Sequence, residues 1–98
     1  MAYGYFGTMR AAPGHRDEVV RILLGGLGGL HAAGCAVYSV SVSDTDPDLI
    51  WIYEVWDSKD SHDASLQLPE VRAAIGRAMP MLTGEFTSQE TTVVGGLP

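Results

Sequence analysis

The residues best suited to chemistry lie in an aromatic-rich stretch near the middle of the chain. It comprises Tyr38, Trp51, Tyr53 and Trp56, and His62 follows it. Aromatic side chains with a few polar groups commonly wall the apolar pockets that bind small molecules. Histidine changes its protonation near neutral pH, so His62 is the candidate general acid or base.

The same stretch also has a purely structural interpretation. Trp51 and Tyr53 can belong to the core or to an interface between subunits, because aromatic residues dominate both. His62 can equally lie on the solvated surface of a helix. Glu54 stands among hydrophobic residues and needs a partner if it is buried, for which structural pairing is favoured over catalysis. The candidate partners are Arg72, Arg10 and a residue of a second subunit.

The sequence lacks the familiar metal and nucleotide motifs. Its three histidines are far apart and have no metal-binding spacing. The glycines at 25, 26, 28 and 29 have no strand directly before them and no Lys-Ser or Lys-Thr after them, so close packing explains them better than phosphate binding. Cys35 is the single cysteine, which excludes an intramolecular disulfide, and we expect it to be buried in a strand. The sequence therefore predicts no metal site.

Length and charge restrict the class of protein further. The 98 residues predict one domain, 1–98, and the 46% hydrophobic content excludes a highly charged disordered chain. A formal net charge of -6, with six scattered basic residues, disfavours binding to nucleic acid or to an anionic membrane surface. We find neither a signal-peptide pattern nor an apolar run long enough to span a bilayer. We therefore expect a cytoplasmic protein.

Periodicity and turn residues predict the elements that position the aromatic stretch. Strands are expected at 3–10, 35–43, 49–56 and 86–94, where β-forming or alternating residues occur. One helix should follow Pro13-Gly14 and end at Ala33-Gly34. Two more should run from Asp57 or Ser58 to about Gln67, and from Pro69 until Pro80 ends it. This order predicts an α+β fold of ferredoxin-like βαββαβ topology, with an antiparallel sheet and helices on one face.

The strand at 49–56 also predicts a partner. Alternate residues are apolar on both of its faces, which is typical of a strand that is covered on both sides. In so short a chain the helices cover one face, so a second copy of the sheet should cover the other. We therefore expect a homodimer of the dimeric α/β-barrel kind.

Several segments, taken together, are similar to a known family. Tyr53-Glu54-Val55-Trp56-Asp57-Ser58 is the most specific, followed by His62-Asp63-Ala64-Ser65-Leu66 and Leu68-Pro69-Glu70-Val71-Arg72. They resemble the central stretch of the antibiotic biosynthesis monooxygenase family, and Ala12-Pro13-Gly14 and Gly34-Cys35 also look familial. The resemblance covers nearly the whole chain. It implies a ferredoxin-like dimer whose two sheets face each other.

The resemblance also implies a range of activities. Some members are cofactor-independent oxygenases of phenols or quinols, whereas others degrade haem or isomerise small metabolites. Many members carry a histidine where this chain has Ser65, one helical turn after His62. The first strand lacks the asparagine of the haem degraders, and Ser65 and Ile75 stand where those members have a tryptophan and a histidine. Haem degradation is therefore disfavoured, and no cofactor is expected.

The function that this resemblance implies is a cofactor-independent monooxygenase that oxidises a phenolic, quinol or polyketide-like aromatic substrate with O2. His62 would act as the catalytic base, while Trp56 and Tyr53 would hold the ring or its oxygens. Ser65 would hold a water or a substrate oxygen. Tyr38 and Arg72 complete the expected substrate-binding set. The alternatives are a non-catalytic dimer that binds a small molecule, and an isomerase or lyase that uses the same pocket.

Overall fold

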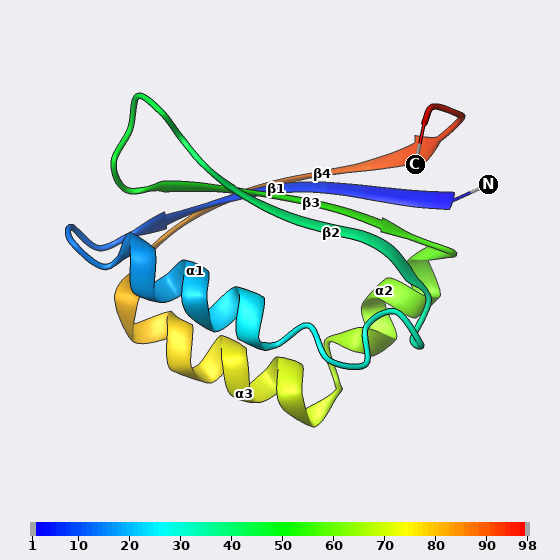
Figure 1. The fold of residues 1–98 in the computed structure, drawn as a ribbon, viewed down its shortest axis with the longest axis horizontal. Helices are drawn as coiled ribbons and strands as arrows, with labels where there is room; N and C mark the ends of the chain where they lie inside the picture. Colours follow the sequence, from blue (N-terminus) through cyan, green and yellow to red (C-terminus); the bar gives the residue numbers. More distant parts are fainter. Residues whose placement is uncertain (1, 98) are drawn as a thin grey trace.

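A four-stranded antiparallel sheet, covered on one face by helices, forms the domain. The structure is a computed structural model that describes residues 2–97. Figure 1 shows the helices gathered below the sheet, and the strand order is β2-β3-β1-β4. The α+β, ferredoxin-like prediction is confirmed. The elements are β1 (Ala2–Ala11), α1 (Arg16–Gly25), β2 (Cys35–Val42), β3 (Leu49–Trp56), α2 (Lys59–Ser65), α3 (Pro69–Ala78), η1 (Met79–Met81) and β4 (Leu82–Val93).

Strand β3 defines the two faces of the sheet. Ile50, Ile52 and Trp56 are buried toward the helices, whereas Trp51, between them in sequence, is 48% exposed on the other face. The alternation is that of a pleated strand, whose successive side chains point to opposite sides. Strand β1 pairs with β3 so that Tyr5 lies opposite Glu54, which places both side chains on the helix-facing side.

Two buried clusters hold the helices to the sheet. The first lies under α1 and α3 and includes Val19, Ile50 and Ala78. The second lies near α2 and includes Trp56 and Cys35, together with Tyr3 and Leu30. Cys35 is buried in β2, as predicted. The site described below lies between these clusters.

The first helix is shorter than the sequence predicted. It ends at Gly25, and turns replace the expected helix as far as Gly34. Gly29 and Gly34 have φ values of +86° and +108°, which are incompatible with an α-helix and costly for residues with a side chain. The prediction of helix from residue 26 to residue 33 was therefore wrong, because the glycines of this segment do not continue a helix. Leu30 nevertheless reaches the core, from a turn.

The remaining boundaries agree with the sequence to within a few residues. Ser58 caps α2, since its side chain accepts a hydrogen bond from the Ser61 backbone N–H, although the helix ends at Ser65 instead of Gln67. Pro69 opens α3, as expected for a proline in a first turn. Strand β4 begins four residues earlier than predicted. Its pairing with β1 contains an irregularity between Met9 and Ala11, so β4 continues through Gly84, where a turn had been expected.

The outer face of the sheet carries large apolar side chains that no helix covers. Phe6 and Trp51 are 43% and 48% exposed, and Tyr53 packs beside Phe6 with ring centroids 4.5 Å apart.

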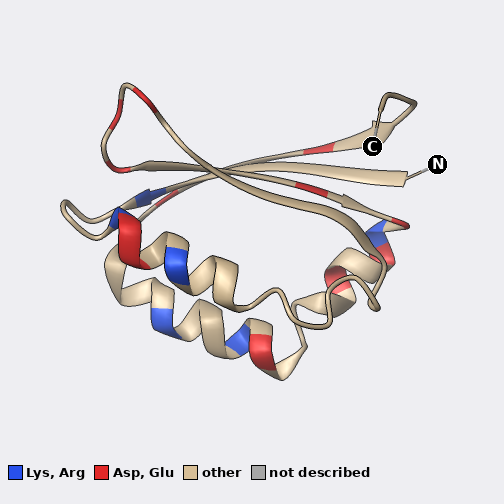
Figure 2. Cartoon of the chain, in the orientation of Figure 1, with Lys and Arg blue, Asp and Glu red and all other residues tan. Residues whose placement is uncertain are grey.

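Figure 2 shows the basic residues dispersed over several elements. Within residues 2–97, no helix combines the length and the apolar character needed to cross a bilayer.

Candidate functional site

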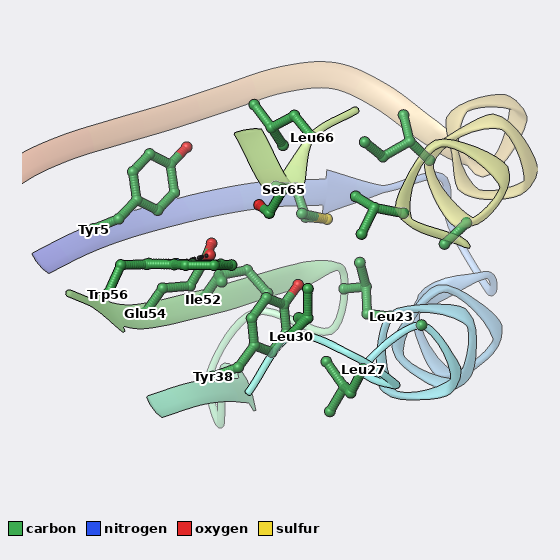
Figure 3. A pocket seen from close by; sticks show the side chains of 15 residues that line it. Tyr5, Leu23, Leu27, Leu30, Tyr38, Ile52, Glu54, Trp56, Ser65 and Leu66 are labelled. Carbon is green, nitrogen blue, oxygen red and sulfur yellow. Dashed lines mark hydrogen bonds between the residues drawn. The ribbon is translucent and has the colours of Figure 1, made fainter. Parts of the chain in front are cut away.

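A cavity of about 260 Å³ lies between the helix-facing side of the sheet and the helices. Figure 3 shows that side chains from β1, β2 and β3 form one wall, with Leu23, Leu27 and Leu30 forming part of the opposite wall. Most of the lining is apolar. The lining residues are Tyr5, Met9, Leu23, Gly26, Leu27, Leu30, Tyr38, Ile52, Glu54, Trp56, Ser65, Leu66, Val71, Ala74 and Ile75.

Four polar side chains interrupt this apolar lining: Tyr5, Tyr38, Glu54 and Ser65. Burial raises the pKa of Tyr38 far above the usual range of tyrosine, and the nearby carboxylate of Glu54 adds to the effect. Tyr38 therefore stays a neutral phenol. Ser65 donates a 2.6 Å hydrogen bond to the backbone carbonyl of His62, so its hydroxyl proton is already used.

Glu54 is the acidic residue of the cavity wall, and it is 8% exposed. The indole Nε1 of Trp56 donates a 2.9 Å hydrogen bond to its Oε1, and the Nε2 of His62 lies 4.0 Å from the same oxygen. Burial raises the pKa of the Glu54 carboxyl, whereas the hydrogen bond from Trp56 and the charge of His62 oppose that effect. Glu54 is thus poised to exchange a proton closer to neutral pH than an exposed glutamate.

His62 is buried, at 8% exposure, within a cluster of aromatic rings. Its ring stacks on Tyr5 with centroids 5.1 Å apart, and it lies at 5.2 Å from Tyr3 and edge-on to Trp56 at 5.8 Å. Its Nδ1 is 3.0 Å from Oδ1 of Asp63. This contact turns the Nε2 of His62 toward Glu54, and the ring lies behind the cavity wall, outside the set of lining residues.

The structure brings some of the sequence-predicted site residues together and separates others. Trp56, Tyr38 and Ser65 line the cavity. His62 does not line it but approaches Glu54, which does. Tyr53 lies on the outer face of the sheet, against Phe6. Arg72 lies on the exposed surface of α3, outside the cavity lining. Tyr53 and Arg72, which the sequence suggested as substrate-binding residues, therefore do not line this cavity.

Within residues 2–97, neither Arg10 nor Arg72 pairs with Glu54, so these two expected partners were wrong, whereas a partner from a second subunit stays a prediction. Arg10 instead pairs with Asp46 at 2.7 Å and with Glu85 at 2.9 Å, at the far end of its strand. The partners that Glu54 does have, Trp56 and His62, come from its own strand and from α2. Strand alternation alone places Glu54 on the same face of β3 as Ile52 and Trp56, although it does not indicate that this face meets the helices.

Metal binding has no evident location in the part of the chain that the structure describes. Within residues 2–97, no group of three or more His, Cys, Asp or Glu side chains is arranged to hold a metal ion. The polar groups of the cavity are suited instead to hydrogen bonding and proton transfer.

The helix-covered sheet and the cavity beneath it define a small α+β domain with an apolar cavity between its two layers. A family model described as antibiotic biosynthesis monooxygenase matches residues 3–77. The chain therefore belongs to the antibiotic biosynthesis monooxygenase family.

Solved structures support the same assignment. The chain is 45% identical to a "putative Antibiotic biosynthesis monooxygenase" from Chloroflexus aurantiacus J-10-fl, with a TM-score of 0.90 over 100% of this chain and 98% of that one. A second protein of that description, from Caulobacter crescentus CB15, is 21% identical and has a TM-score of 0.86, over 96% of this chain and 91% of the other. At this lower identity the likeness concerns the fold. No curated protein matches the chain.

Proposed function

We propose that this protein is a cofactor-independent monooxygenase that oxidises a small phenolic or quinol substrate with O2 in the cavity between sheet and helices. The observation that supports the proposal most is a buried carboxylate, coupled to a histidine, in the wall of an otherwise apolar cavity. Membership of the antibiotic biosynthesis monooxygenase family supports the reaction class.

The size and lining of the cavity favour a small, flat substrate. Its volume of about 260 Å³ is below the range of about 300–1,000 Å³ typical of sites for drug-sized ligands. A substrate of one or two fused rings is therefore more suitable than an extended polycyclic one. The ring would lie against Trp56 and Tyr38, with its hydroxyl near the Glu54 carboxylate.

The reaction begins with removal of the phenolic proton by the Glu54–His62 pair, because the phenolate is a far better electron donor than the phenol. One electron passes from the phenolate to O2, and the resulting radical pair combines to form a carbon–oxygen bond on the ring. The peroxide oxygen takes up the proton held by the pair, which gives a ring hydroperoxide.

The second half of the reaction forms the quinone and water. The ring carbon that carries the hydroperoxide loses its proton to the Glu54–His62 pair, the O–O bond breaks, and the departing hydroxide takes that proton to form water. Overall, one phenol and one O2 are consumed, and one quinone and one water are formed. The substrate supplies every electron, so no flavin or metal is required.

We also propose that the protein works as a homodimer in which the outer faces of two sheets meet. The exposed aromatic residues of that face, Phe6 and Trp51, support this arrangement, because exposed apolar groups gathered on one surface mark an interaction site. The cavity lies on the opposite side of each sheet, so each subunit would carry its own.

Oxygen consumption over a panel of phenols, naphthols, dihydroxynaphthalenes and anthrones tests the proposed activity. Uptake with one- and two-ring substrates is expected. Ala74→Leu, which adds a larger side chain to the cavity wall, should lower kcat/KM more for two-ring than for one-ring substrates. Ala73→Leu, on the exposed side of the same helix, is the matched control and should retain wild-type rates.

Three results would contradict parts of this proposal. Binding of the panel without oxygen uptake would favour the non-catalytic dimer. Conversion of a ligand under argon would instead favour an isomerase or lyase. An equal loss in the Ala74→Leu and Ala73→Leu variants would place the reaction outside this cavity.

A further inference from the structure

We propose that Glu54 is the catalytic residue that takes the substrate proton, and that His62 is a positioning residue behind it. This inference rests on the proposed function, since it assigns the roles within the same cavity. It also revises the role expected from sequence, in which His62 was the base. Glu54 lines the cavity, and His62 does not.

The two oxygens of the Glu54 carboxylate have different environments. The indole N–H of Trp56, at 2.9 Å, and the imidazole Nε2 of His62, at 4.0 Å, both approach Oε1. Within residues 2–97, no side chain hydrogen bonds to Oε2. Oε2 is therefore the atom left to accept a proton from a ligand. A general base must lie within hydrogen-bond reach of the proton that it removes, and Glu54 meets this requirement for a ligand in the cavity.

The other groups around Glu54 are poor alternatives to it. Strand β1 contributes Tyr5 and strand β2 contributes Tyr38 and Cys35, while α2 contributes His62 with Asp63 beyond it. The parts of α1 and α3 that line the cavity contribute apolar side chains and Gly26. Burial raises the pKa of Tyr38 and that of Cys35, so both stay protonated near neutral pH. Glu54 has a raised pKa for the same reason, and in a carboxyl group this makes it a stronger base.

The contacts of His62 suit a supporting role. Its ring is fixed between Tyr5, Tyr3 and Trp56, and the carboxylate of Asp63, whose pKa is lowered, accepts a hydrogen bond from its Nδ1–H. A positive charge on the ring would lower the pKa of Glu54, because it favours the ionised carboxylate. His62 thus sets the protonation of Glu54 without touching the substrate.

The same arrangement restricts the charge of the substrate. Among the described residues, neither Lys nor Arg lines the cavity, whereas Glu54 does. A ligand that carries its own carboxylate or phosphate would bring two negative charges together in an apolar site, which is unfavourable. The substrate class that fits is therefore a neutral phenol or naphthol.

Calorimetric titration with 2-naphthol under argon tests these roles without any oxygen chemistry. The affinity of the wild type for 2-naphthol should increase as the pH rises through the raised pKa of Glu54. This increase should occur at pH values below those at which free naphthol ionises. In Glu54→Gln this dependence should disappear, and affinity at neutral pH should fall about tenfold, as for the loss of a hydrogen bond to a charged group. In His62→Gln the dependence should persist but move to higher pH.

Glu70→Gln, on the exposed surface of α3, should match the wild type, and 2-naphthoate should bind much more weakly than 2-naphthol. If Glu54→Gln keeps the wild-type pH dependence, or if His62→Gln abolishes it, the assignment of Glu54 is overturned while the cavity remains a phenol site. If 2-naphthol does not bind to the wild type at all, the inference and the proposed function are both overturned.

Discussion

The indole Nε1 of Trp56 donates a hydrogen bond to Oε1 of Glu54, two residues earlier on the same face of β3. Trp56 is 1% exposed and is among the largest buried side chains of the domain. The residue that anchors one of the two core clusters therefore also holds the carboxylate of the cavity. Substitutions can separate the two roles of Trp56, because some remove its volume from the core and others remove only its hydrogen bond to Glu54.

Trp56→Ala should destabilise the fold by about 3–5 kcal/mol, as for a large aromatic residue removed from a core. Trp56→Phe keeps most of the ring and removes the hydrogen bond to Glu54, so its cost in unfolding free energy should be clearly smaller. Urea denaturation measures both. Equal losses for the two variants would mean that the hydrogen bond, and not the volume of the ring, accounts for the contribution of Trp56.

Glu54→Gln should stabilise the protein at neutral pH. Burial raises the folded-state pKa of Glu54, so its protonated form is favoured by folding. The stability linked to that proton is fully present below the unfolded-state pKa of about 4.3 and is lost as pH rises through the higher folded-state pKa. The neutral amide introduced by Glu54→Gln would avoid the buried charge.

The gain from Glu54→Gln should therefore be largest at neutral pH and should shrink as pH falls toward about 4.3. Urea denaturation over that range, with Glu70→Gln as the exposed control, measures the effect. A loss of stability at neutral pH in Glu54→Gln would contradict the burial argument.

His62→Ala should lower turnover of a confirmed substrate, because it removes both the charge beside Glu54 and the ring that packs on Tyr5. The fall should not exceed that of Glu54→Gln, for which loss of a general base predicts about a hundredfold to ten-thousandfold. Steady-state kinetics and circular dichroism separate lost chemistry from lost structure. His31→Ala, in an exposed turn, is the control. Full activity in His62→Ala would remove His62 from the site.

Trp51→Glu should convert the proposed homodimer into a folded monomer. A charge on the outer sheet face would be buried without a partner in the dimer but hydrated in the monomer. Leu24→Glu, an equally exposed apolar position on α1, should remain dimeric. Light scattering at micromolar concentration gives the mass directly, and a wild-type monomer under these conditions would contradict the proposed dimer.

Strand β3 illustrates what could be predicted from the sequence. Its alternation separates Ile50, Ile52 and Trp56 from Trp51 and Tyr53 without any structure. The sequence does not indicate which of two apolar faces meets the helices, because both carry large hydrophobic residues. Tyr53 was assigned to the substrate site because it belongs to the aromatic-rich stretch, and the structure places it on the outer face.

The role of Glu54 was harder to predict, because a single carboxylate in an apolar strand is compatible with many partners. Its contacts with Trp56 and His62 depend on how α2 returns over the end of β3, which sequence periodicity does not describe. The cavity likewise depends on Leu27 and Leu30. They reach it from the non-helical segment after α1, although their spacing suggested a helix.

Incorporation of labelled oxygen tests the central claim most directly. The purified wild-type protein would be incubated with 1-naphthol under ¹⁸O₂, and oxygen uptake, product mass and hydrogen peroxide would be measured together. The account predicts one O2 consumed per naphthol, one labelled oxygen atom in the quinone and no accumulation of peroxide, with the rate strongly reduced in Glu54→Gln. Quinone without the label, with two molecules of hydrogen peroxide formed per quinone, or no uptake above that of a protein-free control, would contradict it.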